Sequence, residues 1–162
     1  MPSETYRRRV NALAIVCSAA FAGCNLFIGL SMGTYWLSLD PITFMNGFWS
    51  QFTHFTFTIM PLFILTLAGL VLSARLDWRE AKLKRLWLIA IGLYVAASLI
   101  TLGYHLPENF RLREALYSPD EAAAARSLWL TVHIPRILIA FGIPFAALWA
   151  VFERGASRQS NA

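Results

Sequence analysis

Long runs of apolar residues dominate the chain and alternate with short segments that carry nearly all of its charge. A helix rises about 1.5 Å per residue, so about 20 apolar residues cross a hydrocarbon core about 30 Å thick. Four runs reach that length, at residues 10–36, 52–73, 86–104 and 128–152. The pattern predicts an all-α fold, a four-helix bundle integral to a membrane.

The composition agrees with a membrane protein. Of the 162 residues, 57% are hydrophobic and 14% are charged, whereas a soluble domain usually carries about 25% charged residues. Four spans use about 80 positions and leave room only for short connections. Residues 1–162 are therefore expected to form a single membrane domain. The net charge of +5 does not indicate nucleic-acid binding, because no basic stripe follows one face.

The basic residues predict the orientation, because cytoplasmic segments retain positive charge. Ten lie before the first run, in the 74–85 connection or after the last run, and three lie in the connections 37–51 and 105–127. The ten are Arg7, Arg8, Arg9, Arg75, Arg79, Lys82, Lys84, Arg85, Arg154 and Arg158, and the three are Arg111, Arg113 and Arg126. Both termini are therefore expected in the cytoplasm, with a bacterial inner membrane as the expected location.

Two further features bear on the helix ends. The first run is too long for a cleaved signal peptide and lacks a clear cleavage site, so it is expected to remain as a helix. Ser118, Pro119 and Glu121 are typical of a helix start, which predicts a helical extension of the fourth span on the outer side. Pro107 is expected to end the third helix and to leave residues 110–117 as a short lid.

Three prolines, Pro61, Pro135 and Pro144, fall inside the predicted spans. Each removes a backbone donor and favours a kink. Such kinks open cavities in some helical bundles, but proline is also common in membrane helices without any such role. A cavity and ordinary membrane-helix composition are therefore both compatible with these prolines.

The polar residues within the spans gather at two depths. At a rise of about 1.5 Å per residue, His54, His105 and His133 each lie about 30 Å from the cytoplasmic end of their span. Arg136 and Asn25 lie slightly deeper, about 25 Å from the cytoplasmic ends of theirs. His133 and Arg136 share a helix face and form the candidate centre of a polar pocket near the outer surface. The alternative for Arg136 is to snorkel into the headgroups.

The remaining histidines and both cysteines give weaker signals. His54 has polar neighbours and is a candidate for substrate binding, whereas His105 at a helix end is expected to be structural. Paired metal-ligand motifs such as H-x-x-x-H and C-x-x-C are absent from the sequence, so no metal site and no cofactor are predicted. A haem held by two axial histidines is an alternative. Cys17 and Cys24 lie two helical turns apart and are expected to be packing residues.

The tryptophans divide into two groups along the predicted spans. Such a distribution is typical of aromatic belts at the two membrane interfaces. The expected outer belt is Trp36, Trp49 and Trp129, and the expected inner belt is Trp78, Trp87 and Trp149. Trp129 is one turn from His133, so a second interpretation places it against a flat aromatic ligand.

Several of these residues together carry a family resemblance. Four predicted spans, Met60-Pro61 in the second, the run L-P-E-N-F-R-L at 106–112, and Trp129, His133 and Arg136 at the start of the fourth resemble the anthrone oxygenase-like membrane family. That family is largely a bacterial domain of unknown function. An asparagine commonly stands in it where this chain has His133.

The resemblance implies cofactor-independent oxygenation of an activated aromatic ketone. His133 would act as the base that removes a doubly benzylic proton. Arg136, with Asn25, would stabilise the developing oxyanion. Trp129 would stack on the substrate, while Asn109 and Arg111 would act from the lid.

Other classes of function fit the same sequence, because a fold does not fix a chemistry. The chain could be a non-enzymatic subunit or binding protein of a larger membrane complex, or a homo-oligomer. It could also be a redox subunit that holds haem or quinone among its histidines. Colour after purification would favour the redox subunit, and tight co-purification with other proteins would favour the complex.

Overall fold

The computed structural model describes residues 3–159, with side chains through Ala156. Of these residues 92% are helical and none forms a strand. The elements are α1 (Glu4–Phe27), η1 (Ile28–Met32), α2 (Gly33–Ser38), α3 (Pro41–Leu76), α4 (Ala81–Ile100), η2 (Thr101–His105), α5 (Leu106–Arg113) and α6 (Pro119–Gln159). The side chain of Arg158, which entered the charge count, lies outside the described residues.

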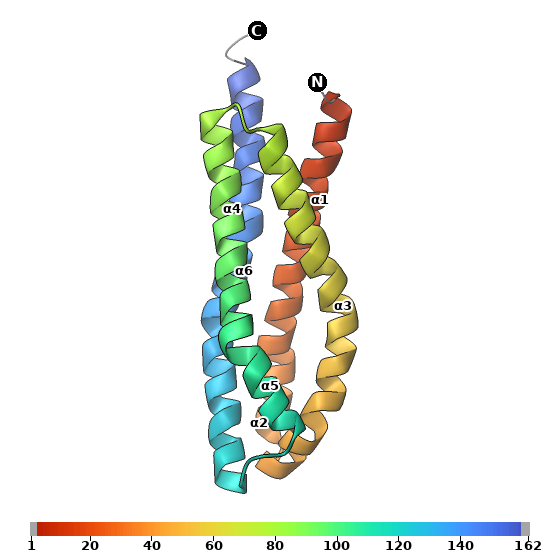
Figure 1. Cartoon of the computed structure of the whole chain (residues 1–162), viewed down its shortest axis with the longest axis vertical. Coiled ribbons are helices and arrows are strands. Elements are labelled where there is room, and N and C mark those ends of the chain that lie inside the picture. The colour runs from red at the N-terminus through yellow and green to blue at the C-terminus, as the bar shows by residue number, and fades with distance from the viewer. Residues whose placement is uncertain (1–2, 160–162) are drawn as a thin grey trace.

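Four long helical segments make up the described part of the chain. They are Glu4–Ser38, Pro41–Leu76, Ala81–Arg113 and Pro119–Ala156, and each is long and apolar enough to cross a membrane by length and composition. The prediction of an all-α fold with four long apolar helices is confirmed. The helices form an elongated bundle in which the start of α1, the end of α6 and the α3–α4 connection lie at one end (Figure 1).

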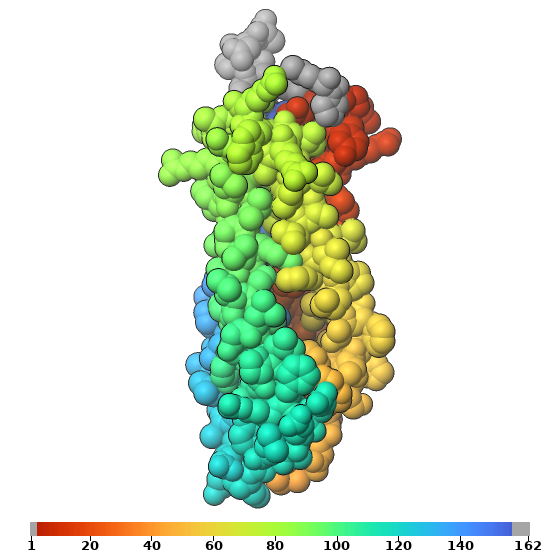
Figure 2. All heavy atoms as spheres, in the orientation of Figure 1, coloured from red at the N-terminus to blue at the C-terminus, as the bar shows by residue number. Residues whose placement is uncertain are grey.

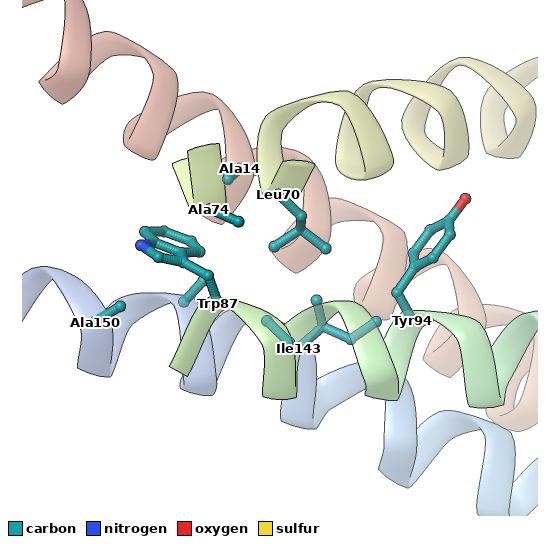
Figure 3. Packing of buried hydrophobic residues seen from close by; sticks show 9 residues of the cluster. Ala14, Leu70, Ala74, Trp87, Tyr94, Ile143 and Ala150 are labelled. Carbon is teal, nitrogen blue, oxygen red and sulfur yellow. The ribbon is translucent and has the colours of Figure 1, made fainter. Parts of the chain in front are cut away.

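A layer of small and aromatic side chains packs the half of the bundle nearer the termini (Figure 3). Trp87 and Ile143 are fully buried in it, between the small residues Ala14, Ala74 and Ala150. Small residues let helix backbones approach closely, and the large side chains fill the space that remains. This half of the bundle is therefore tightly packed.

A buried ionic cluster closes the same end. Asp77, which follows α3, accepts hydrogen bonds from Arg7 of α1 at 2.6 Å and from the Trp87 indole of α4 at 2.8 Å. Arg154 of α6 donates a third bond to the same carboxylate. The sequence indicated only a topological role for these arginines, but their pairing with one carboxylate joins all four long helices.

The opposite end is more helical than the sequence predicted. The expected connection 37–51 shrinks to Leu39 and Asp40, because Asp40 accepts a bond from the Thr43 N–H at 3.0 Å and Pro41 begins α3. An acidic cap followed by proline starts a helix well before the apolar run begins. Arg126 of α6 covers the end of α2 by donating to the carbonyls of Trp36 and Leu39, both at 2.7 Å.

The expected break at Pro107 is wrong. Helix continues through it, because the π-turn η2 shifts the hydrogen-bond register so that the Leu106 N–H bonds to the Thr101 carbonyl five residues back. Pro107 then stands at the start of α5, where its missing N–H costs little. The segment expected to be a lid is therefore mostly the helix α5, and the connection 105–127 shrinks to residues 114–118.

The predicted start of the fourth helix is confirmed. The α6 helix begins at Pro119, and Glu121 Oε2 accepts bonds from the Ser118 N–H at 2.9 Å and from the Ser118 hydroxyl at 2.7 Å. The helix then runs without interruption through Pro135 and Pro144, as α3 does through Pro61. Among the described residues, the long helices change type at the two π-turns, whereas the three prolines lie within α-helix.

Candidate functional site

A cavity of about 370 Å³ lies among the four helices, in the half of the bundle away from the termini. Its walls are mostly apolar and include Phe21, Phe52, Ile59 and Phe63. The polar side chains of His105, His133, Arg136 and Asn109 lie at one side of it, with Trp129. Figure 2 shows a hollow between α3 and the helical segment that begins with α4. Most of the remaining lining comes from α3 and from η2, the turn that follows α4.

His133 is fully buried on α6 and is bonded to α1 through one ring nitrogen. Its Nε2 lies 2.9 Å from the backbone carbonyl of Asn25. A carbonyl can only accept, so Nε2 carries the proton and donates. In the neutral ring Nδ1 then holds a lone pair, and no described residue bonds to it. The fold therefore holds a free imidazole base in the cavity wall.

Gly29 makes this approach of His133 to α1 possible. A Cβ atom at this position would lie 2.9 Å from His133 Cδ2 and 2.5 Å from Ile137 Cδ1. Gly33, one turn on, faces Leu130 of α6 in the same way. The G-x-x-x-G pair thus serves contact between helices within this chain.

The two π-turns of the structure both border the cavity. Ile28 of η1 lines it, as do Thr101, Leu102 and His105 of η2. The η1 turn begins three residues after Asn25, whose carbonyl accepts the His133 bond. Single π-turns within α-helices occur frequently at functional sites because they redirect side chains and carbonyls. Their convergence here marks the cavity as the candidate site.

Three rings form a contiguous group on the polar side of the cavity. Trp129 stacks on His133 with ring centroids 4.9 Å apart and an interplanar angle of 17°. His105 contacts both, with centroids 4.6 Å from Trp129 and 5.4 Å from His133. Both nitrogens of the buried His105 ring are without a partner among the described residues. From the sequence His105 was expected to be structural, and its place in this group was not predicted.

Arg136 brings a buried positive charge to the same wall. The residue is 7% exposed, and no hydrogen bond or ion pair joins its side chain to another described residue. A buried arginine usually pairs with a carboxylate or lies against a carbonyl, because desolvation of the guanidinium is costly. An anion or a strongly polarised oxygen in the cavity would satisfy it.

The α5 helix holds the far side of the site. Asn109 accepts a 2.8 Å hydrogen bond from the Trp129 indole, which fixes the ring against His133. Glu108, also in α5, accepts a 2.6 Å hydrogen bond from the hydroxyl of Tyr117. This bond joins α5 to the connection that follows it. Partial burial, and next the bond to this carboxylate, raise the pKa of Tyr117 above its ordinary value.

The structure brings some of the sequence-predicted site residues together and not others. His133, Arg136, Asn109 and Trp129 line one cavity. Asn25 does not line it: its backbone carbonyl bonds to His133, and its side-chain amide donates to the Phe21 carbonyl at 2.7 Å. His54 points away on the exposed face of α3, and it does not line the cavity. Arg111 is exposed on α5 and lies 3.7 Å from Glu108.

The expected aromatic belts are only partly present. Trp36, Trp87 and Trp129 are buried inside the bundle, each with its indole N–H bonded to another side chain. Buried tryptophan requires such a partner, so these three rings serve packing between helices. Trp78 and Trp149 are exposed, as a belt residue would be.

The two cysteines of α1 are free thiols. Cys17 is buried and Cys24 is half-buried. Among the described residues, no group of three or more histidine, cysteine, aspartate or glutamate side chains is placed to hold a metal ion.

No family model, no curated protein and no solved structure matches this chain. The chemistry available to the site therefore rests on its geometry. One wall presents a neutral base and an unpaired cation, next to a rigid aromatic surface and inside an apolar cavity. Such an arrangement suits removal of a proton from an apolar substrate whose electrons move onto an oxygen.

Proposed function

We propose that the chain is an integral membrane protein with both termini in the cytoplasm. The four long apolar helices support insertion, and the excess of Lys and Arg near the termini and the α3–α4 connection supports the orientation. The cavity then lies toward the outer half of the bilayer, where a bacterial inner membrane would supply lipid-soluble ligands.

For its activity, we propose cofactor-independent oxygenation of an activated aromatic ketone of the anthrone type. The observation that carries this proposal is the pairing of the His133 Nδ1 lone pair with the unpaired Arg136 in one apolar cavity. Membership of the anthrone oxygenase-like family, which the motifs suggested, is part of the same proposal.

In the first step His133 Nδ1 takes a proton from the doubly benzylic carbon. The electron pair of the broken C–H bond moves into the ring system and onto the ketone oxygen, which becomes an enolate. Arg136 stabilises that negative charge, and the low dielectric of the cavity strengthens the interaction. Trp129 supports the flat ring system by stacking.

Dioxygen is the oxidant in the steps that follow. The enolate gives one electron to dioxygen, and the resulting carbon radical and superoxide combine into a carbon-bound peroxide. The His133 imidazolium returns its proton to the outer peroxide oxygen. Loss of the second C–H proton and cleavage of the O–O bond release water and leave a new carbonyl. One ketone and one dioxygen thus give one quinone and one water.

The test is oxygen uptake and quinone absorbance for the protein in lipid vesicles supplied with anthrone. His133→Gln removes the base and is expected to lower kcat by about 10²–10⁴. Arg136→Gln removes the cation and is expected to lower it by about 10²–10³. His54→Gln, on the exposed face of α3, is the matched histidine control and should leave the rate unchanged. Wild-type activity in His133→Gln would refute the proposal.

The haem-binding alternative has its own test. Its axial ligands would be His105 and His133, but these rings lie edge to face in direct contact and the Nε2 of His133 is bonded to Asn25. A porphyrin between them would require both rings to move apart. An absorption spectrum of the purified protein, oxidised and then reduced with dithionite, tests this directly, and a stoichiometric Soret band would replace the oxygenase proposal with a redox one.

A further inference from the structure

The cavity opens sideways, at the middle of two helices, and not at an end of the bundle. Two residues that line it are also heavily exposed, namely Met60 of α3 at 47% and Leu102 of η2 at 60%. The residues at the back, such as His133 and Trp129, are buried. A lining residue that is also exposed marks the mouth, and the hollow between these two helices is visible in Figure 2.

Both ends of the cavity are closed by packed side chains. Toward α2 and α5, the buried residues Trp36, Phe44, Phe48 and Leu112 fill the bundle. Toward the termini, Phe21 and Phe63 lie against Tyr94, with ring centroids 6.4 Å and 4.8 Å from it. Interiors packed in this way leave no passage for a molecule larger than water.

The mouth lies within the hydrocarbon region of the proposed bilayer. Met60 lies near the middle of α3, several turns from either end of that helix. Residues 52–74 and 86–107, which flank the mouth on both helices, contain no Asp, Glu, Lys or Arg. Its exposed neighbours one turn away are Ile64 and Leu99. An aqueous solute has no polar path to such an opening.

We infer that the cavity is loaded from within the bilayer, through the mouth between Met60 and Leu102, by a lipid-dissolved molecule with a flat apolar body and one acidic or carbonyl oxygen. The oxygen enters first, because Arg136 and His105 at the back have no other partner among the described residues. The inference rests on the membrane embedding and ligand cavity of the proposed function, but not on its chemistry.

The test uses anthracene-2-carboxylate, a flat fluorescent acid with no benzylic C–H to oxidise, dissolved in vesicles that contain the full-length protein. Energy transfer from the protein tryptophans to the anthracene reports loading, since Trp129 lines the cavity. The acid should load, and Arg136→Gln should weaken its binding by about tenfold while leaving the binding of anthracene, which carries no oxygen, unaffected. Equal binding of anthracene-2-carboxylate and anthracene by the wild type would overturn the claim that the oxygen enters first.

The mouth is tested by the rate of loading. The pair Met60→Phe and Leu102→Phe should slow it about threefold or more, and alanine at both positions should speed it, because exposed side chains gate access without contributing to the fold. The matched control, Ile64→Phe with Leu99→Phe, changes exposed residues one turn away and should leave the rate as in the wild type. Equal rates in all these variants would overturn the lateral route.

The two proposals fail in different ways. Loading of anthracene-2-carboxylate without oxygen uptake on anthrone would refute the oxygenase and leave the lateral route standing. Oxygen uptake on anthrone together with equal loading rates in all the mouth variants would refute the lateral route and leave the oxygenase standing.

Discussion

Replacing Gly29 with alanine should displace His133 from its position in the cavity wall. The added Cβ would lie 2.5 Å from Ile137 Cδ1 and 2.9 Å from His133 Cδ2, whereas non-bonded carbon atoms prefer about 3.5–4.0 Å. The Ile137 methyl can rotate away. The His133 ring has to move by about 0.6–1 Å, and it is held by the Asn25 carbonyl and by stacking on Trp129.

The cost follows from three contributions. Overpacking destabilises by about 1–3 kcal/mol, and loss of the His133 hydrogen bond adds about 1 kcal/mol. The better helix propensity of alanine offsets about 1 kcal/mol, which leaves a net loss of about 1–3 kcal/mol. The proposed oxygenase activity should fall further than stability, because a displaced base no longer faces the substrate.

The control is Gly23→Ala in the same helix, since a Cβ there would meet nothing within 4 Å. Thermal unfolding in detergent and oxygen uptake on anthrone are measured for both variants. Gly23→Ala should match or exceed the wild type in stability. If Gly29→Ala behaves like Gly23→Ala in both assays, then His133 is not held against α1 as described.

Three further predictions concern other parts of the bundle. Asp77→Ala leaves Arg7 and Arg154 without their shared carboxylate, and thermal unfolding should show a loss of about 3–5 kcal/mol, whereas the exposed Asp120→Ala should stay within about 0.5 kcal/mol of the wild type. Trp129→Phe keeps a ring but removes the donor to Asn109, and thermal unfolding should show a loss of about 1 kcal/mol in stability. The raised pKa of Tyr117 means that the unfolded chain loses this proton first as pH rises above about 10, so stability should fall there, and Tyr117→Phe should show a shallower fall in alkaline unfolding curves.

Much of the fold could be predicted from the sequence because each long helix contains an uninterrupted apolar run. The helix ends could not be predicted from the runs alone. Helix α3 starts at Pro41 because Asp40 caps it, and not because the apolar run begins there. The polar residue Gln51 lies inside this helix, where its amide oxygen accepts a hydrogen bond from the Trp36 indole. A cap followed by proline was the signal that could have found this start.

The site shows a similar division. His133 and Arg136 could be paired from their spacing, because residues three apart on a helix share a face. The role of His105 depended on the π-turn before α5, which rotates the ring into the bundle. No residue pattern specifies such a register shift. His54 was misplaced because the depth of a residue along a helix says nothing about which way it faces.

Removal of a substrate proton by His133 is the central claim, and anaerobic deuterium exchange tests it most directly. Anthrone in vesicles with the protein, in deuterated buffer without oxygen, should exchange its doubly benzylic protons at a rate set by the base alone. The wild type and His54→Gln should exchange equally fast, and His133→Gln should fall toward the rate of vesicles without protein. Undiminished exchange in His133→Gln would contradict the assignment of the base.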